Sequence, residues 1–261
     1  MAQAKMTDRP VALITGGGTG IGAAIARVLA ARYKVVICGR RAAPIDAIAE
    51  EIGGLAIVAD LGDVGAAANL VPDVIARCGR LDALVLNAGV ILPAAVSLMP
   101  LADWQTQIAI NLTAPFIVAQ SALPHLVARK GSIVAIASAA ARGTGQGLAA
   151  YSASKAGLVL LTQTIAFENA RHGLRANIIS PGWVRTEMGD AEMQSLCGSV
   201  EAGYRQVTQN VPQRRAGFPD EIAKVVEFLL SDAAGYINGA VIPVDGGGTI
   251  VDVGMLEFDI E

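Results

Sequence analysis

A tyrosine and a lysine stand one helical turn apart in this chain, in a spacing that suits proton transfer. Tyr151 and Lys155 begin an apolar stretch of helical length, so both side chains project from the same helix face. A nearby ammonium stabilises a phenolate, and we expect Lys155 to lower the pKa of Tyr151 from about 10 toward the working pH. Ser138 follows the apolar run 133–137. Such a tyrosine could exchange a proton with a carbonyl or alcohol oxygen that the Ser138 hydroxyl orients.

A glycine-rich segment after the first apolar run is suited to holding a pyrophosphate. The sequence TGGGTGIG spans residues 15–22 and leads directly into an alanine-rich helical stretch. Glycines let the backbone approach a pyrophosphate and aim the amides of a helix N-terminus at it. No Lys-Ser or Lys-Thr pair follows the glycines, which excludes a Walker-type P-loop. The segment predicts a dinucleotide site, and a simple tight turn is the alternative.

Two arginines follow the second apolar run, where a dinucleotide fold meets the adenosine ribose. After Lys34–Cys38 the chain reads Gly39, Arg40, Arg41, whereas an NAD site usually places an acid there to hold the ribose hydroxyls. Arginine suits a 2′-phosphate, so Arg40 predicts NADP(H) in preference to NAD(H). Use of NAD(H), with the arginines solvated, is the alternative. Asp60, after the third run, could accept from the adenine amino group or cap a helix.

Short apolar runs alternate with amphipathic stretches along the chain, which is the pattern of βαβ units. Most runs are apolar on both faces, as in a parallel sheet covered on each side. The chain is therefore predicted to be α/β, with a doubly wound parallel sheet of about seven strands and helices on both faces. The expected strands are Val11–Thr15, Lys34–Cys38, Leu55–Ala59, Ala83–Leu86, Ser132–Ala137, Ala176–Ser180 and Ala240–Val244. The expected helices are Gly22–Arg32, Pro44–Ile52, Val64–Arg77, Leu101–Ala128, Ala150–His172 and Pro219–Leu230.

One polar segment, from about residue 186 to 215, interrupts this alternation. A long insertion after a strand is a common place for a lid, and we expect this segment and the loop 139–148 to line a substrate pocket. No repeat or linker divides the chain. Residues 1–261 are therefore expected to form one dinucleotide-binding and catalytic domain.

Composition and charge exclude several classes of protein. Of the 261 residues 53% are apolar, and the formal net charge is −3. Such a chain can bury a core, and it offers no positive field for nucleic acid or an anionic membrane. The uncharged stretch 83–102 imitates a membrane span, but Asn87, Gly89 and Pro93 interrupt it, which favours a buried strand followed by a loop. We expect neither nucleic acid nor membrane as a partner.

The cysteines indicate a reducing compartment. Cys38, Cys78 and Cys197 are widely spaced and form no CxxC or Cys/His array, so we expect buried thiols and no metal site. The first ten residues lack the apolar core of a signal peptide. We therefore expect a cytoplasmic protein.

The chain carries the ordered motifs of one known family. They are, in chain order, Thr15–Gly22, Asn87-Ala88-Gly89, Asn111, Ser138, Tyr151 with Lys155, and Pro181-Gly182 followed by Thr186. In these motifs the chain resembles the short-chain dehydrogenase/reductase family, over nearly its whole length. One departure is Leu86, where many members have a second asparagine before the N-A-G motif.

The resemblance implies a single-domain Rossmann fold and an oxidoreductase that interconverts a carbonyl and an alcohol by hydride transfer with NAD(P)(H). Tyr151 would give or take the proton, Ser138 would fix the oxygen, and Lys155 would hold the nicotinamide ribose. Asn111 would support, through its main chain, a water that links Lys155 to solvent. A catalytically idle NAD(P)-binding sensor or regulator on the same fold is the alternative.

The resemblance also implies a small carbonyl or alcohol substrate of undetermined identity and a homo-oligomer. Members commonly pair the long helices that are predicted here at Leu101–Ala128 and Ala150–His172, which favours a tetramer. The cofactor-binding residues would be Gly16, Gly18, Thr19, Gly20, Ile21, Gly22, Arg40, Asp60, Leu61, Asn87, Ala88, Gly89, Tyr151, Lys155, Pro181, Gly182, Val184 and Thr186.

Overall fold

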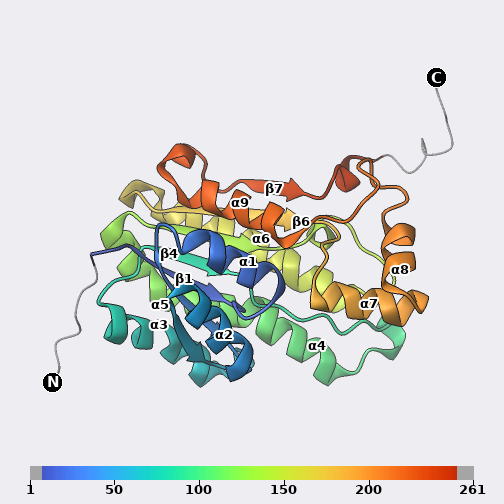
Figure 1. Cartoon of the computed structure of the whole chain (residues 1–261), viewed down its shortest axis with the longest axis horizontal. Helices are drawn as coiled ribbons and strands as arrows, with labels where there is room; N and C mark the ends of the chain where they lie inside the picture. The colour runs from blue at the N-terminus through green and yellow to red at the C-terminus, as the bar shows by residue number, and fades with distance from the viewer. Residues whose placement is uncertain (1–7, 252–261) are drawn as a thin grey trace.

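The computed structural model describes residues 8–251, and one seven-stranded sheet organises this part of the chain. The strand order is β3-β2-β1-β4-β5-β6-β7, with every neighbouring pair parallel (Figure 1). The order reverses between β1 and β4, as in a doubly wound α/β sheet. The strands are β1 (Val11–Thr15), β2 (Lys34–Gly39), β3 (Leu55–Val58), β4 (Ala83–Leu86), β5 (Ser132–Ile136), β6 (Arg175–Pro181) and β7 (Val241–Val244). Each predicted strand is present, with ends that differ by a residue or so.

Helices cover both faces of the sheet, and short 3-10 turns lie in several of the connections between strands and helices. The helices are α1 (Gly20–Leu29), α2 (Ala42–Ile52), α3 (Val64–Cys78), α4 (Leu101–Ile108), the π-helical η2 (Ala109–Thr113), α5 (Ala114–Arg129), α6 (Ala149–Asn169), α7 (Glu187–Cys197), α8 (Val200–Val207) and α9 (Pro219–Leu230). The 3-10 turns are η1 (Val96–Leu98), η3 (Ala139–Ala141), η4 (Ala170–His172), η5 (Asp232–Ala234) and η6 (Gly248–Ile250).

Alternate residues of each strand serve two separate hydrophobic cores. In β1, Ala12 and Ile14 pack with α1, α2 and α9, whereas Val11 and Leu13 pack with α3, α5 and α6. All four side chains are completely buried. Because successive side chains of a strand point to opposite faces, a sheet covered on both sides needs apolar residues at every position. This explains the uninterrupted apolar runs of the sequence.

The predicted helix Leu101–Ala128 is present as a continuous helical stretch, but it is not regular throughout. The structure divides it into α4, the π-helical η2 and α5. Pro115 supplies the physical reason: it has no amide hydrogen, so the carbonyl of Asn111 loses its i+4 donor. The π-helical turn contains Asn111.

The same helical stretch, Leu101–Arg129, is long and apolar enough to cross a membrane by length and composition alone. In the structure, Val118, Ala122 and Leu126 of this stretch are fully buried in the core that includes α3 and the sheet. The α5 part of this stretch is therefore a helix that packs one side into the hydrophobic core of the domain.

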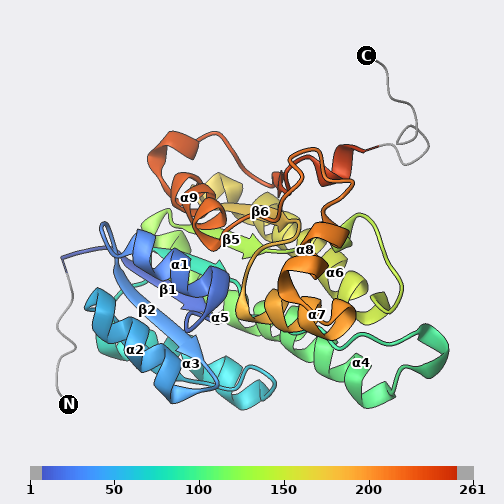
Figure 2. The same cartoon turned by 45° about the vertical axis from the view of Figure 1, so that its right-hand side comes forward.

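The polar segment 186–215 contains two short helices, α7 and α8, which the sequence analysis did not identify. Their capping signals are present in the sequence: the hydroxyls of Thr186 and Ser199 accept from the first-turn amides of α7 and α8. Gly198 ends α7 in a left-handed conformation. Figures 1 and 2 show both helices, in orange, at the end of the molecule toward which the strand arrows point.

The cysteines follow the expectation in two of three cases. Cys38 and Cys78 are buried free thiols, whereas Cys197 is half-buried at the end of α7. The Cys197 thiol donates to Oε1 of Gln206 at 3.3 Å. Its position on an outlying helix, away from the sheet, explains why it is not a core residue.

Candidate active site

Ser138 and Tyr151 lie together at the carboxyl edge of the sheet, where parallel sheets place their ligands. Ser138 follows β5, and its hydroxyl accepts a hydrogen bond from the amide of Ala140 at 3.1 Å. Tyr151 is half-buried in the first turn of α6. The Ser138 hydroxyl lies close enough to the Tyr151 phenol to affect its pKa. The structure thus brings together the two hydroxyl groups that the sequence analysis assigned to one site.

Lys155 lies one turn further along α6 and has only 3% of its surface exposed. Its Nζ donates to the carbonyl oxygen of Ile136 at 2.8 Å and lies 5.7 Å from the centre of the Tyr151 ring. Burial disfavours the charged ammonium and lowers the pKa of Lys155 to about 8. Gly89 leaves room for the lysine, because a Cβ on Gly89 would lie 3.3 Å from Nζ.

The pKa of Tyr151 is shifted upward, opposite to the direction expected from the Tyr-Lys spacing. Burial is the largest cause and raises the pKa, the hydrogen bond with Ser138 lowers it, and the negative charge of Glu192 raises it. Lys155, whose own pKa is lowered by burial, does not offset the upward shift of Tyr151. Tyr151 therefore keeps its proton at neutral pH, which suits a proton donor.

Asn111 is completely buried in η2 and is held at three points. Its Oδ1 accepts from the amide of Val90 at 2.8 Å, and its Nδ2 donates to the carbonyl of Val90 at 2.9 Å and to Oγ of Ser154 at 3.1 Å. Because Pro115 cannot donate to the Asn111 carbonyl, that oxygen is free of its ordinary helical donor. The carbonyl oxygen of Asn111 can therefore accept a hydrogen bond from another group, such as a water molecule.

A cleft of about 180 Å³ runs beside the glycine-rich segment. Several of the residues expected to bind a cofactor line this cleft. They come from the glycine-rich segment, from the ends of β2 and β3, and from the N-A-G motif. The lining residues are Gly16, Gly18, Thr19, Gly39, Arg40, Arg41, Pro44, Ile45, Ala59, Asp60, Leu61, Ala88, Gly89, Val90 and Ile110. Sequence reasoning missed the apolar members Pro44, Ile45, Val90 and Ile110, since an apolar side chain carries no chemical signature of a binding site.

Thr15 and Asn87 fasten the glycine-rich segment to β4. The Thr15 hydroxyl accepts from the amides of Asn87 at 2.9 Å and Ala88 at 3.1 Å. In return, Nδ2 of Asn87 donates to the carbonyls of Thr15 at 2.9 Å and Gly16 at 3.0 Å. The Asn87 side chain thus braces the segment from within the protein.

The start of α1 forms a cradle that has no room for side chains. A Cβ on Gly22 would lie 2.0 Å from the carbonyl oxygen of Gly16. Thr19 occupies the N-cap of α1, and Gly20, Ile21 and Gly22 form its first turn. Bare backbone amides at a helix N-terminus attract an anion, so these residues fit the pyrophosphate of a dinucleotide.

The two arginines after β2 have different surroundings. Arg41 lies 3.8 Å from the carboxylate of Glu187 on α7, whereas no carboxylate of residues 8–251 lies within ion-pair distance of Arg40. A side chain at Gly39 would collide with Ile45, because its Cβ would lie 2.9 Å from Cγ2. Arg40 is thus the cation without a partner in the cleft, and the acid typical of NAD sites has no room at Gly39.

Asp60 is not a helix cap, which was the alternative to a role in the cleft. The cap of α3 is Asp63, whose Oδ1 accepts from the amide of Ala66 at 2.7 Å. Asp60 accepts from the amide of Gly62 at 2.9 Å and lines the cleft next to Leu61. Its second carboxylate oxygen is available to a ligand.

The segment after β6 reaches back to the glycine-rich segment. Pro181 is the last residue of β6. Val184, three residues later and shortly before α7 begins, is buried. The Thr186 hydroxyl accepts from the amide of Gly189 at 3.0 Å. Its methyl group lies against Gly20, 3.2 Å from where a Cβ would stand. Thr186 and Gly182 therefore lie on the connection between the sheet edge and α7.

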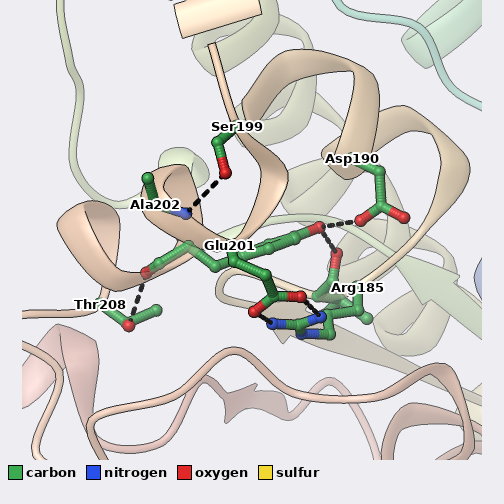
Figure 3. Close-up of polar contacts among 8 residues, drawn as sticks. Arg185, Asp190, Ser199, Glu201, Ala202 and Thr208 are labelled. Carbon is green, nitrogen blue, oxygen red and sulfur yellow. Dashed lines mark hydrogen bonds and ion pairs between the residues drawn. The ribbon is translucent and has the colours of Figure 1, made fainter. Parts of the chain in front are cut away.

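Side-chain bonds join α7 to α8 (Figure 3). The Tyr204 hydroxyl of α8 contacts Oδ1 of Asp190 at 2.9 Å and the carbonyl of Val184 at 3.3 Å. Arg185 lies 4.8 Å from the centre of the Tyr204 ring and forms a two-pronged ion pair with Glu201, at 2.7 and 2.6 Å. We call this set of five residues the lid clamp.

The family model described as enoyl-(acyl carrier protein) reductase matches residues 16–249, from the glycine-rich segment to η6. The chain is a short-chain dehydrogenase/reductase. Members of this family use NAD(P)(H) and are typically oligomeric. The cradle at α1 agrees with this use of a dinucleotide.

Individual relatives support the assignment to the short-chain dehydrogenase/reductases. The chain is 38% identical over 253 residues to D-threitol dehydrogenase of Mycolicibacterium smegmatis, covering 93% of this chain and 94% of that protein. It is 34% identical over 249 residues to meso-2,3-butanediol dehydrogenase of Serratia marcescens, covering 94% and 96%. The crystal structure of levodione reductase matches with a TM-score of 0.89 at 32% identity, covering 95% and 100%. These proteins are dehydrogenases and reductases that act on alcohols or ketones.

Proposed function

We propose that this short-chain dehydrogenase/reductase is an NADP(H)-dependent oxidoreductase acting on CH–OH groups, which interconverts a ketone or aldehyde and an alcohol. The observation that carries the proposal is that the Ser138 and Tyr151 hydroxyl groups share the carboxyl edge of the sheet with the buried Lys155, whose Nζ lies 5.7 Å from the centre of the Tyr151 ring. A protonated phenol next to a second hydroxyl can hold a carbonyl oxygen at two points and protonate it. The relatives described above offer no support for a catalytically idle sensor.

The residues of the chain have separate roles in this proposal. Tyr151 donates its proton to the carbonyl oxygen during reduction and removes one from the alcohol during oxidation. Ser138 orients the same oxygen by a hydrogen bond. Lys155 holds the nicotinamide ribose, and the main-chain carbonyl of Asn111 supports a water through which the proton is exchanged with solvent. When bound, NADP(H) supplies or accepts the hydride.

Different parts of the cleft would hold different parts of the cofactor. The backbone amides at the start of α1 suit the pyrophosphate, and Asp60 has an acceptor for the adenine amino group. Arg40 would pair with the 2′-phosphate, because it has no carboxylate partner within residues 8–251. The segment 181–186 would meet the nicotinamide end. A bond between arginine and phosphate favours NADP(H) over NAD(H), which remains the weaker cofactor.

We also propose that the protein is a cytoplasmic homotetramer. Support comes from α6, where Leu160 and Phe167 are 66% and 86% exposed although they are large and apolar. A helix that packs one face on the sheet leaves such residues to a partner subunit. Light scattering at micromolar protein should give the mass of four chains, and a monomeric mass would contradict the proposal. Unpaired Cys38 and Cys78 fit a reducing compartment.

A substrate screen tests the proposed reaction. Purified protein is mixed with NADPH and a panel of ketones and aldehydes, or with NADP⁺ and a panel of alcohols, and nucleotide absorbance is followed. We expect turnover of at least one neutral carbonyl or alcohol, and a lower kcat/KM with NADH or NAD⁺. Absence of nucleotide-linked turnover across both panels would contradict the proposed function.

A further inference from the structure

One ion pair joins the wall of the nucleotide cleft to α7. Nη2 of Arg41 lies 3.8 Å from Oε2 of Glu187. Arg41 occupies the N-cap of α2 and lines the cleft, whereas Glu187 is the first residue of α7. The other ion pairs within residues 8–251 contain no residue that lines the cleft. A ligand in the cleft can therefore compete directly with this pair.

The backbone at Glu187 is anchored, although its side chain is not. The hydroxyl of Thr186 caps α7 by accepting from the amide of Gly189, and its methyl group lies against Gly20 of the glycine-rich segment. The lid clamp fixes α7 to α8 (Figure 3). The Glu187 side chain itself is 73% exposed. It therefore stands at a fixed place beside the cofactor cradle and can still change partners.

The contact between Arg41 and Glu187 is weak enough to be exchanged. The two groups are 3.8 Å apart and both side chains are largely exposed, so water and salt screen their attraction. A phosphate monoester carries close to two negative charges at pH 7 and three acceptor oxygens, and it matches the fork of a guanidinium. A 2′-phosphate in the cleft can therefore take Arg41 from Glu187, and the exposed carboxylate is then solvated by water.

The neighbouring arginine shows what this exchange changes. Arg40 also lines the cleft, but no carboxylate of residues 8–251 lies within ion-pair distance of it. Arg40 can meet a phosphate without giving up an ion pair, whereas Arg41 must first leave Glu187. The two adjacent cations are therefore not equally available to the cofactor.

We propose that Glu187 is a positioning residue that moderates the preference for NADP(H) by holding Arg41 away from the 2′-phosphate. It acts through Arg41 and touches no reacting atom. With NAD(H), which has no 2′-phosphate, the pair stays intact, and with NADP(H) the guanidinium is divided between carboxylate and phosphate. This inference rests on the proposed function, because it requires a dinucleotide whose 2′-phosphate lies at the two arginines.

Binding of NADPH and NADH to the substrate-free protein tests this assignment without any turnover. The two nucleotides differ only in the 2′-phosphate, so the ratio of their Kd values, NADH over NADPH, measures its contribution. Glu187→Gln releases Arg41 and should raise this ratio by about threefold or more, the effect of freeing a cation from an exposed pair. Glu187→Asp keeps the negative charge and should give a smaller rise. Fluorescence titration provides both Kd values.

A double variant and a control separate the path through Arg41 from a general change in charge. In Arg41→Ala, the further change Glu187→Gln should leave the ratio unaltered, because the group through which Glu187 acts is gone. Glu51→Gln breaks the exposed Arg27–Glu51 pair, whose residues do not line the cleft, and should also leave the ratio unaltered. Raising the salt concentration should shrink the difference between the wild type and Glu187→Gln.

The possible failures are distinguishable. An unchanged ratio in Glu187→Gln overturns the assignment, and so does the same rise in the Arg41→Ala background, which would indicate a general field. Equal weakening of both nucleotides in Glu187→Gln indicates a structural role and also overturns it. A wild type that prefers NADH, with a ratio that Glu187→Gln still shifts toward NADPH, supports the role of Glu187 and contradicts the proposed cofactor preference. Binding of neither nucleotide contradicts this inference and the proposed function together.

Discussion

The carboxyl edge of the sheet and the helix pair α7 and α8, which corresponds to the expected lid and is called the lid below, are held together by different kinds of contact. At the edge, backbone groups and fully buried side chains such as Asn111 and Lys155 make the contacts. In the lid, side chains make them, and the Arg185–Glu201 pair lies at the surface, where an ion pair contributes little. A change at the edge should therefore damage cofactor binding or chemistry, whereas a change in the lid should alter substrate choice or stability.

Matched tyrosine variants give the largest expected contrast between the two regions. Tyr151→Phe removes the proton donor and should lower kcat by about 100-fold or more, with NADPH affinity nearly unchanged. Tyr204→Phe removes the hydroxyl contacts to Asp190 and Val184 and should lower the free energy of unfolding by about 1 kcal/mol, with kcat within a few-fold of the wild type. Steady-state kinetics and urea unfolding measure both effects. Tyr151→Phe that retained most of its turnover would falsify the assigned role.

Burial of Lys155 predicts a pH dependence of stability. Its pKa is about 8 in the folded protein and 10.5 when exposed, so the folded state binds fewer protons between these values. Stability contributed by this site therefore rises as the pH rises from 7 to 10, by roughly 2–3 kcal/mol. Lys155→Met should lack this rise. Urea unfolding of the cofactor-free proteins at pH 7, 8, 9 and 10 provides the measurement.

The control for this pH series is Lys224→Met on α9, where the lysine is exposed. Its unfolding free energy should follow that of the wild type across the whole range. Parallel curves for Lys155→Met and the wild type would show that the ammonium is not buried as described.

Matched arginine variants sharpen the comparison within the nucleotide cleft. Arg40→Ala should erase most of the preference for NADPH over NADH, a change of about 10–100-fold in the ratio of kcat/KM values. Arg41→Ala should change that ratio by less, because Arg41 pairs with Glu187 of the lid. Equal kcat/KM for the two cofactors in the wild type, or a ratio that Arg40→Ala leaves untouched, would exclude Arg40 as the phosphate ligand.

Matched glycine variants separate the two regions by ligand binding. In Gly22→Ala the new methyl group meets the backbone oxygen of Gly16 at 2.0 Å, so the cradle must move, which should destabilise the fold by about 1–3 kcal/mol and weaken NADPH binding. In Gly189→Ala it meets the Tyr204 hydroxyl at 2.5 Å and the carbonyl oxygen of Val184 at 2.9 Å, so the adjustment falls on the contacts between α7 and α8 rather than on the cradle. NADPH binding measured by fluorescence titration should survive in Gly189→Ala alone, and equal losses would contradict the distinction.

The sheet and the nucleotide edge were predictable because their signals are local in the sequence. Each strand is a short run whose two faces are both covered, so apolar residues occupy every position. The glycine-rich segment is recognisable from residue type alone, because positions such as Gly22 have no space for a Cβ and must be glycine. The π-helical turn at Asn111 was also encoded locally, by Pro115, but the regular helix pattern around it concealed the signal.

Other features depend on the folded environment of a side chain. The spacing of Tyr151 and Lys155 predicted a lowered tyrosine pKa, yet burial of both groups, which no spacing reveals, raises the first and lowers the second. The negative charge of Glu192 on α7 also acts on Tyr151 of α6, and no sequence pattern links these two residues. Residue type and periodicity thus determined the fold and the identity of the candidate reacting groups. Only the tertiary structure decided their protonation and their neighbours, because desolvation and through-space charge depend on where the chain places them.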